Sequence, residues 1–185
     1  MTTSAHVRIT PQGAELDGAI IARGGLTALY RKFAGDYPKF FKMDSLCKLG
    51  FLAAEILLKD FSAEQKENCA LILFNRNGSL ITDRNYENTI ADPENYFPSP
   101  ALFVYTLANI VTGEIAIRHK IYGETSFYVI DNYDTARIEE IVRNATLTSS
   151  PSMILYGWVD YDDENDYLAD FKIINNISTD NYINK

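Results

Sequence analysis

Two cysteines, Cys47 and Cys69, are the side chains best suited to nucleophilic chemistry in this sequence. A reactive cysteine needs a lowered pKa, which a histidine, a helix N-terminus or a basic neighbour can supply. Cys47 instead lies in an apolar helical pattern three residues after Asp44, and Cys69 begins a continuous apolar run, CALILF. We therefore predict that both thiols are small core residues and that neither is a nucleophile.

The histidines and the acidic residues are the other candidates for a site. His6 lies near the start of the chain and His119 closes a helical pattern, so their spacing forms neither a catalytic dyad nor a metal site. Carboxylates gather in residues 160–166, but without the glycine and glutamate positions of a calcium-binding EF-hand loop. The Gly-rich stretch at residues 13–25 contains no phosphate-binding motif. We predict no metal, no cofactor and no autonomous active site.

One acidic domain is what the composition indicates. The chain has 185 residues, of which 46% are hydrophobic, so we expect a single domain over residues 1–175 and a frayed tail over residues 176–185. The net charge of −8 argues against nucleic-acid binding, which needs clustered Lys and Arg. No apolar run approaches the roughly 18 residues of a membrane span, and no signal peptide is visible. We expect a cytoplasmic protein with reduced thiols.

Strand and helix patterns alternate along the chain. Strands are predicted over residues 6–10, 69–74, 127–130, 152–159 and 168–174, and helices over residues 27–33, 45–58, 101–119 and 134–144. Ser62 and Gln65 form a capping-box pattern that opens one more short helix. Residues 82–98 are expected to form a long loop with a helical turn, and residues 160–166 an acidic turn. The alternation predicts a layered α/β domain with a mostly parallel sheet.

Gly113 lies inside the longest of these helices. A glycine there costs about 1 kcal/mol relative to alanine. We therefore expect another backbone or helix to pack closely against this position.

Three segments resemble a known family in the correct order. They are YPKFFKMDSLCKLGFLAAEILL (residues 37–58), CALILFNRNGSL (69–80) and PALFVYTLANIVTGEIAIRHKIYGE (100–124). Together they are similar to the amino-terminal half of a β-ketoacyl-acyl-carrier-protein synthase. Asn109, Gly113 and Gly123 stand at matching places, while Ala108 and Glu124 replace two prolines of the family. The resemblance implies a thiolase-like half-domain with α/β/α layers.

The nucleophile implied by the resemblance is missing. In that family a cysteine follows about nine residues after the matching glycine, at the turn from a strand into a buried helix. Counting from Gly123 reaches Asn132, within the cysteine-free run YGETSFYVIDNYD. Asparagine cannot form the acyl thioester that condensation needs. The resemblance also places the family's catalytic histidines beyond Lys185, so we expect no catalytic residue, although the family is one of acyltransferases (3-oxoacyl-acyl-carrier-protein synthases).

The resemblance implies a pseudoenzyme similar to chain length factors, which are cysteine-less partners of active ketosynthases. We expect such a role in type II fatty-acid, aryl-polyene or polyketide biosynthesis. One alternative is a half-subunit of a split condensing enzyme. Another is a module that binds an acyl chain or acyl carrier protein, with a pocket lined by Leu102, Phe103 and Leu107.

The partners implied are a second copy of the chain or an active ketosynthase. Because ketosynthases pair sheet edge to sheet edge near the nucleophile strand, residues 127–130 are the expected contact strand, and the aromatic-rich stretches 37–41 and 96–105 are further candidates. An acidic acyl carrier protein would need a basic patch, for which Lys39, Lys42 and Lys48 are the candidates.

Overall fold

The computed structural model describes residues 3–175, without the side chains of residues 146–149. The strands are β1 (Ala5–Thr10), β2 (Gly13–Leu16), β3 (Ala19–Arg23), β4 (Cys69–Asn75), β5 (Thr125–Val129), β6 (Met153–Asp163) and β7 (Asp166–Asn175). The helices are α1 (Leu26–Phe33), α2 (Ser45–Leu58), α3 (Ala63–Glu67), α4 (Leu80–Glu87), α5 (Pro100–Val104), α6 (Ile110–His119) and α7 (Thr135–Ser149), with 3-10 turns at Pro38–Lys42 and Pro93–Asn95. The tail predicted at residues 176–185 lies outside the described residues.

Within the described residues the strands form one sheet in the order β3-β2-β1-β7-β6-β4-β5. The pairs of β4 with β5 and β6 are parallel, whereas the pairs β6–β7, β7–β1, β1–β2 and β2–β3 are antiparallel. The α/β class is confirmed, but the expectation of mostly parallel pairing is wrong. Short hairpin connections within β1–β3 and between β6 and β7 impose antiparallel pairing, because a parallel pair needs a long crossover.

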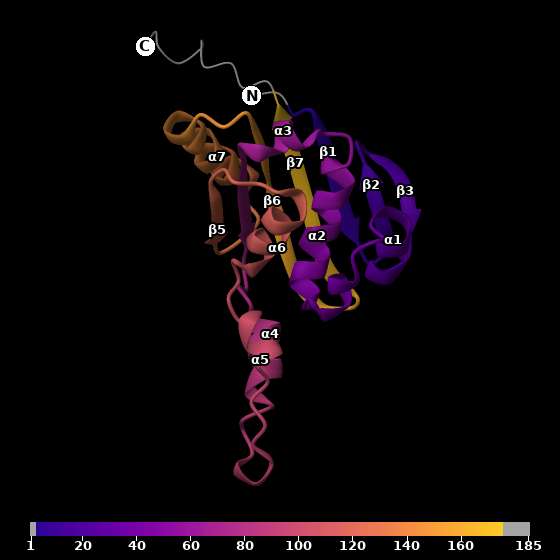
Figure 1. The fold of residues 1–185 in the computed structure, drawn as a ribbon, viewed down its shortest axis with the longest axis vertical. Coiled ribbons are helices and arrows are strands. Elements are labelled where there is room, and N and C mark those ends of the chain that lie inside the picture. Colours follow the sequence, from indigo (N-terminus) through magenta and orange to yellow (C-terminus); the bar gives the residue numbers. More distant parts are fainter. Residues whose placement is uncertain (1–2, 176–185) are drawn as a thin grey trace.

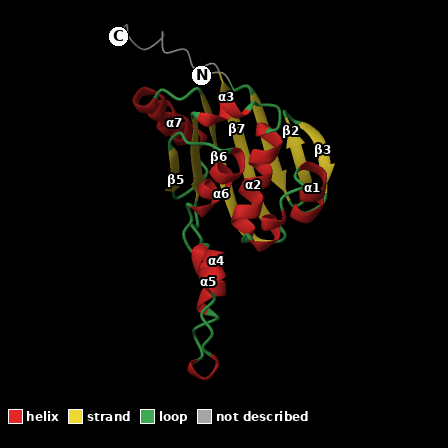
Figure 2. Cartoon of the chain, viewed as in Figure 1, coloured by secondary structure: helices red, strands yellow, loops and turns green. Residues whose placement is uncertain are grey.

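The sheet separates two hydrophobic cores, so the α/β/α layering is confirmed (Figures 1 and 2). α1, α2 and α6 cover one face, where Val7, Ile9 and Phe171 meet the helices. On the other face, Ile138 and Val142 of α7 pack in the second core. Every residue of β4 is buried, as its continuous apolar run predicts.

α2 is the central helix of the larger core. It begins after Asp44, whose side chain accepts the Cys47 N–H at 2.9 Å, as predicted. Twelve of its fourteen residues are buried. Gly50 faces α6, and a Cβ built on it would lie 2.5 Å from Cγ2 of Val111. The close approach of helices expected at Gly113 therefore occurs at Gly50, since nothing lies within 4 Å of a Cβ built on Gly113.

The single helix predicted over residues 101–119 is two helices, α5 and α6. Between them the Thr106 hydroxyl donates to the Phe103 carbonyl at 2.7 Å, and the Ser79 hydroxyl donates to the Thr106 carbonyl. Such bonds from side chain to backbone compete with the helical ladder. The helical apolar spacing continues across the break, which is why the sequence pattern does not show it.

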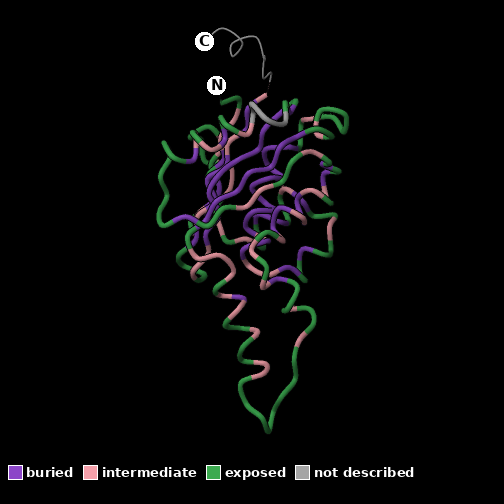
Figure 3. The backbone as a smooth tube through the Cα atoms, turned by 90° about the vertical axis from the view of Figure 1, so that its left-hand side faces the viewer, coloured by how far each residue is buried: buried purple, intermediate pink, exposed green. Residues whose placement is uncertain are grey.

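α4, α5 and the segment that joins them form an arm that extends away from the sheet, and most of it is exposed (Figure 3). Its two sides are joined by the Tyr86 and Phe103 rings, 5.5 Å apart, and by a bond from the Phe97 N–H to the Thr89 carbonyl. The long loop expected over residues 82–98 is thus partly helical, with α4 reaching Glu87.

Two segments for which the sequence patterns predict no strand contribute to strands. The Gly-rich stretch forms β2 and β3, and Gly13, at φ 139°, passes so close to β3 that a Cβ would lie 2.2 Å from the Ala22 carbonyl oxygen. In the acidic stretch, β6 continues to Asp163 and β7 starts at Asp166. The acidic turn is therefore shorter than predicted.

Candidate functional site at the strand ends

Three parallel strands, β4, β5 and β6, end at one corner of the sheet. Ligands of open α/β sheets bind outside the carboxyl ends of such strands. At the end of β4, the Asn75 side chain donates to the Gly78 carbonyl at 2.8 Å and accepts the Gly78 N–H at 3.0 Å. This closed turn presents Arg76 and Asn77 to the end of β6, where both contact Asp162.

Asn132 lies between β5 and α7, so the strand and the helix predicted on either side of it are present. Asp134, two residues later, caps α7 by accepting the Arg137 N–H at 3.1 Å. The Asn132 side chain is exposed and lines a cavity of about 280 Å³. Arg76, Tyr133, Trp158, Asp160 and Asp162 line the same cavity.

Tyr133 and Trp158 form the aromatic wall of this cavity. Their rings stack at 5.3 Å with an interplanar angle of 26°. Burial first, and then the charge and hydrogen bond of Asp170, raise the pKa of the Tyr133 hydroxyl. The Tyr133 side chain therefore ties the segment after β5 to β7.

Asp160 is the most buried charged residue of the cavity, at 8% exposure. Its Oδ2 lies 3.8 Å from Nε of Arg76, while its Oδ1 has no hydrogen-bond partner among the described residues. Arg76 contacts Asp162 more closely, at 3.1 Å. Burial, and then the neighbouring charge of Asp162, raise the pKa of Asp160.

A second polar cluster lies beside the cavity, on β1 and β7. Asp170 is 5% exposed and lies 2.8 Å from Nε2 of His6 and 3.3 Å from Arg8. No sequence pattern indicates this cluster, because it depends on the register between strands at opposite ends of the chain.

The two histidines lie on opposite faces of the sheet, so they cannot act together as a catalytic pair at Asn132. His6 alternates with Val7, which faces the α2 core, so His6 lies on the opposite face of the sheet. His119 is buried beside α2, with Nε2 3.1 Å from Oε1 of Glu55. One histidine is thus on each side of the sheet.

Both cysteines are in the core, as predicted. Cys47 is 2% and Cys69 0% exposed, and both are free thiols. Burial, and then the charge of Asp44, raise the pKa of Cys47 well above its usual value, and burial raises that of Cys69 to about 12. Neither thiol is ionised near neutral pH, so neither can act as a nucleophile.

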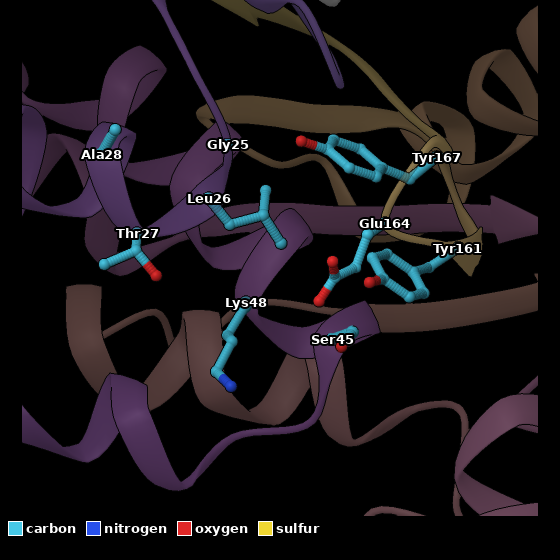
Figure 4. Close-up of a pocket in the computed structure, with 9 residues that line it drawn as sticks. All are labelled: Gly25, Leu26, Thr27, Ala28, Ser45, Lys48, Tyr161, Glu164 and Tyr167. Atoms are coloured by element: carbon cyan, nitrogen blue, oxygen red, sulfur yellow. The ribbon is translucent and has the colours of Figure 1, made fainter.

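A larger hollow, of about 390 Å³, lies between the start of α1, the start of α2 and the β6–β7 hairpin (Figure 4). Tyr161, Glu164 and Tyr167 enter it from the hairpin, and Ser45 and Lys48 enter it from α2. The side chains that line this hollow include both a basic and an acidic group. None of them has a buried polar atom without a hydrogen-bond partner. The strand-end cavity is therefore the better candidate, although it is smaller.

Two expected binding surfaces stay predictions. Phe103 and Leu107 are each 56% exposed, and Leu102 lines a small cavity of about 110 Å³. Lys39 lies 2.7 Å from the buried Glu114, Lys42 is exposed, and Lys48 lines the α1–α2 hollow.

Among the described residues, no group of three or more His, Cys, Asp or Glu side chains is arranged to hold a metal ion. In the same part of the chain, the helices are too short or too polar to cross a membrane.

Comparisons with known proteins identify the fold. A chain of the ketosynthase (ApeO) in complex with its chain length factor (ApeC) from Xenorhabdus doucetiae matches with a TM-score of 0.65 and 13% identity, over 97% of this chain and 81% of that one. A chain of the ishigamide ketosynthase/chain length factor matches with a TM-score of 0.69 and 14% identity, over 92% of this chain and 61% of that one, so this chain spans less than two thirds of its length. No protein-family model and no curated protein matches the sequence. The chain has the ketosynthase-like thiolase fold that its sequence predicts.

Proposed function

We propose that this chain is a non-catalytic partner of an active ketosynthase, similar to a chain length factor. The thiolase-like fold supports a ketosynthase-like or chain-length-factor-like role. The observation that carries the proposal is the lack of a usable thiol: Asn132 stands where the sequence resemblance implies the nucleophile, and both cysteines are buried and protonated. A condensing enzyme cannot form its acyl thioester without that thiol.

The edge strand β5 supports pairing with another subunit. β5 is the last strand of the sheet in the described part of the chain and pairs with β4 on one side, so no described strand pairs with the backbone groups on its other side. Two of its residues, Tyr128 and Val129, are 39% and 57% exposed. An unprotected edge of this kind favours sheet-to-sheet association.

The arm offers a second apolar contact surface. Tyr96, Phe97, Phe103 and Val104 are between 49% and 73% exposed. In the other aromatic stretch expected to make contacts, residues 37–41, Phe40 is buried in the core, where its ring stacks on Tyr30 at 4.3 Å. We therefore assign partner contacts to β5 and the arm.

Under this proposal the chain acts in a type II fatty-acid, aryl-polyene or polyketide pathway, with an acyl carrier protein as a further partner. Two free buried thiols suit the reducing cytoplasm, where we place the complex.

Affinity purification from the native cell tests this role with a matched pair of variants. Val129→Lys places a charge on the β5 edge, and Ile20→Lys places one on β3, the opposite edge strand, where Ile20 is 58% exposed. The proposal expects the wild type and Ile20→Lys to retain a ketosynthase and Val129→Lys to lose it. Equal recovery with both variants would exclude β5 as the contact, and no ketosynthase with the wild type would refute the role.

A further inference from the structure

The cavity beside Asn132 is lined by a buried carboxylate that the described chain satisfies only in part. Against the larger raising effect of burial, backbone N–H groups of Arg76 and Asn77 lie close enough to Asp160 to lower its pKa. Asp160 lines this cavity, and its Oδ1 is buried without a hydrogen-bond partner among the described residues. A buried polar atom left unpaired costs about 1–3 kcal/mol, and more when it is charged. A ligand that supplies a donor to Asp160 would recover this cost.

The charge of the cavity favours a cationic donor. Asp160, Asp162 and Asp166 line it, against one basic lining residue, Arg76. Arg76 does not neutralise Asp160 fully, because it lies 3.1 Å from Asp162 but 3.8 Å from Asp160, and its side chain is 52% exposed. The cavity therefore keeps a negative balance that a second cation can complement.

The shape and lining of the cavity favour a planar cation. Tyr133, which is 38% exposed, presents the accessible ring, while Trp158 and Tyr167 line the cavity at 4% and 6% exposure. A guanidinium combines several N–H donors with a flat surface that stacks on an aromatic ring. A compact ammonium can also lie over a ring, but it lacks the flat surface that stacks on the ring and the paired N–H donors that match a carboxylate. A bare metal ion is disfavoured, because the described residues hold no suitable group of three ligands.

We propose that this cavity binds a guanidinium group, with Asp160 accepting its N–H donors and the exposed Tyr133 ring of the Tyr133–Trp158 stack contacting its face. The group belongs either to a small free compound or to an arginine side chain of a partner protein. The proposal does not depend on the partner role above, because it rests on the cavity alone.

Trp158 makes the test direct, because it is the sole tryptophan of the sequence and lines the cavity. Its fluorescence is titrated with N-ethylguanidinium and, separately, with N-ethylurea, which has a similar shape and no charge. We expect saturable change with the cation and binding at least about tenfold weaker for the urea. No saturable change with the cation, or equal affinity for both compounds, would overturn the proposal.

Substitutions test whether the change in Trp158 fluorescence depends on Asp160. Asp160→Asn keeps the shape of the side chain, removes its charge and is expected to weaken cation binding by about tenfold or more. Glu164→Gln removes a charge from the same hairpin but lines the other hollow, so it should bind like the wild type. If Asp160→Asn does not fold, as judged by circular dichroism, Asp166→Asn replaces it and must also weaken binding. Unchanged affinity in the folded variant would overturn the assignment.

The complex purified from the native cell separates the two sources of the group. If a partner's arginine fills the cavity, N-ethylguanidinium no longer changes Trp158 fluorescence in the complex, and Asp160→Asn recovers less partner. If a free compound fills it, mass spectrometry of the acid-released small molecules finds a guanidinium compound with wild type and less of it with Asp160→Asn. A complex with neither property, together with no titration in the isolated chain, would refute the proposal.

Discussion

Gly50 of α2 and Val111 of α6 lie so close that a Cβ on Gly50 would be 2.5 Å from Cγ2 of Val111. Val111 is fully buried and β-branched, so it has little freedom to move away. Gly50→Ala should therefore lower the free energy of unfolding by about 1–3 kcal/mol, despite the higher helix propensity of alanine. Urea unfolding at equilibrium measures the change.

The matched control is Gly113→Ala. Gly113 is also inside a helix, α6, but nothing lies within 4 Å of its Cβ position. This variant should gain stability by up to about 1 kcal/mol. Adding Val111→Ala to Gly50→Ala should cost less than the two single changes together. Equal effects at the two glycines would contradict the contact between α2 and α6.

Stability should fall in acid partly through Glu55. Burial raises its pKa, but hydrogen bonds from His119 and Arg118 outweigh burial and bring the pKa below its usual value of 4.5. The folded state thus favours the carboxylate, so the stabilisation is present above about pH 5 and is lost as the pH falls through the lowered pKa. Glu55→Gln should be less stable at pH 7 and show a flatter decline below about pH 5.

Urea unfolding between neutral and acidic pH checks this expectation. The control is Glu64→Gln, which removes an exposed carboxylate at the start of α3. It should keep the acid dependence of the wild type. If Glu55→Gln declined in parallel with the wild type, the ion pairs at Glu55 would not contribute to the acid response.

The native protein should show no reactive thiol. Cys47 and Cys69 are buried, and burial raises both pKa values. A chromogenic disulfide reagent near pH 8 should therefore release almost no thiolate from the folded chain and two equivalents after denaturation. Rapid reaction of one thiol in the folded protein would place a nucleophile where we describe none.

Asn132→Cys should restore a thiol without restoring catalysis. The position is exposed, so the new cysteine should react with the same reagent in the folded state. It should nevertheless give no malonyl decarboxylation and no condensation, because His6 is held by Asp170 and His119 is buried on the other face of the sheet. Either activity in the purified variant would refute this account of the site.

The sequence predicts elements better than it predicts their contacts. Asp44, Ser62 and the apolar run of β4 each indicate their local structure correctly, because capping and burial leave periodic signals. The sense of strand pairing does not depend on local sequence, so the periodic patterns do not predict the mixed sheet. They do not predict the break after α5 either, because Ser79, which lies outside that helix, helps to stabilise it.

The candidate site shows the same limit. The position of Asn132 between a strand and a helix follows from local patterns, and the structure has both elements. The cavity beside it requires the parallel register that sets Phe74 of β4 opposite Trp158 of β6. The sequence therefore suggested a solvated acidic turn at residues 160–166, where the structure has the buried Asp160.

Native mass spectrometry of the tagged wild-type chain, purified from its own cell, tests the central claim most directly. The account predicts one copy of this chain with one copy of a full-length ketosynthase. A chain that is recovered only as a homodimer, or that is alone and has condensing activity, would contradict it.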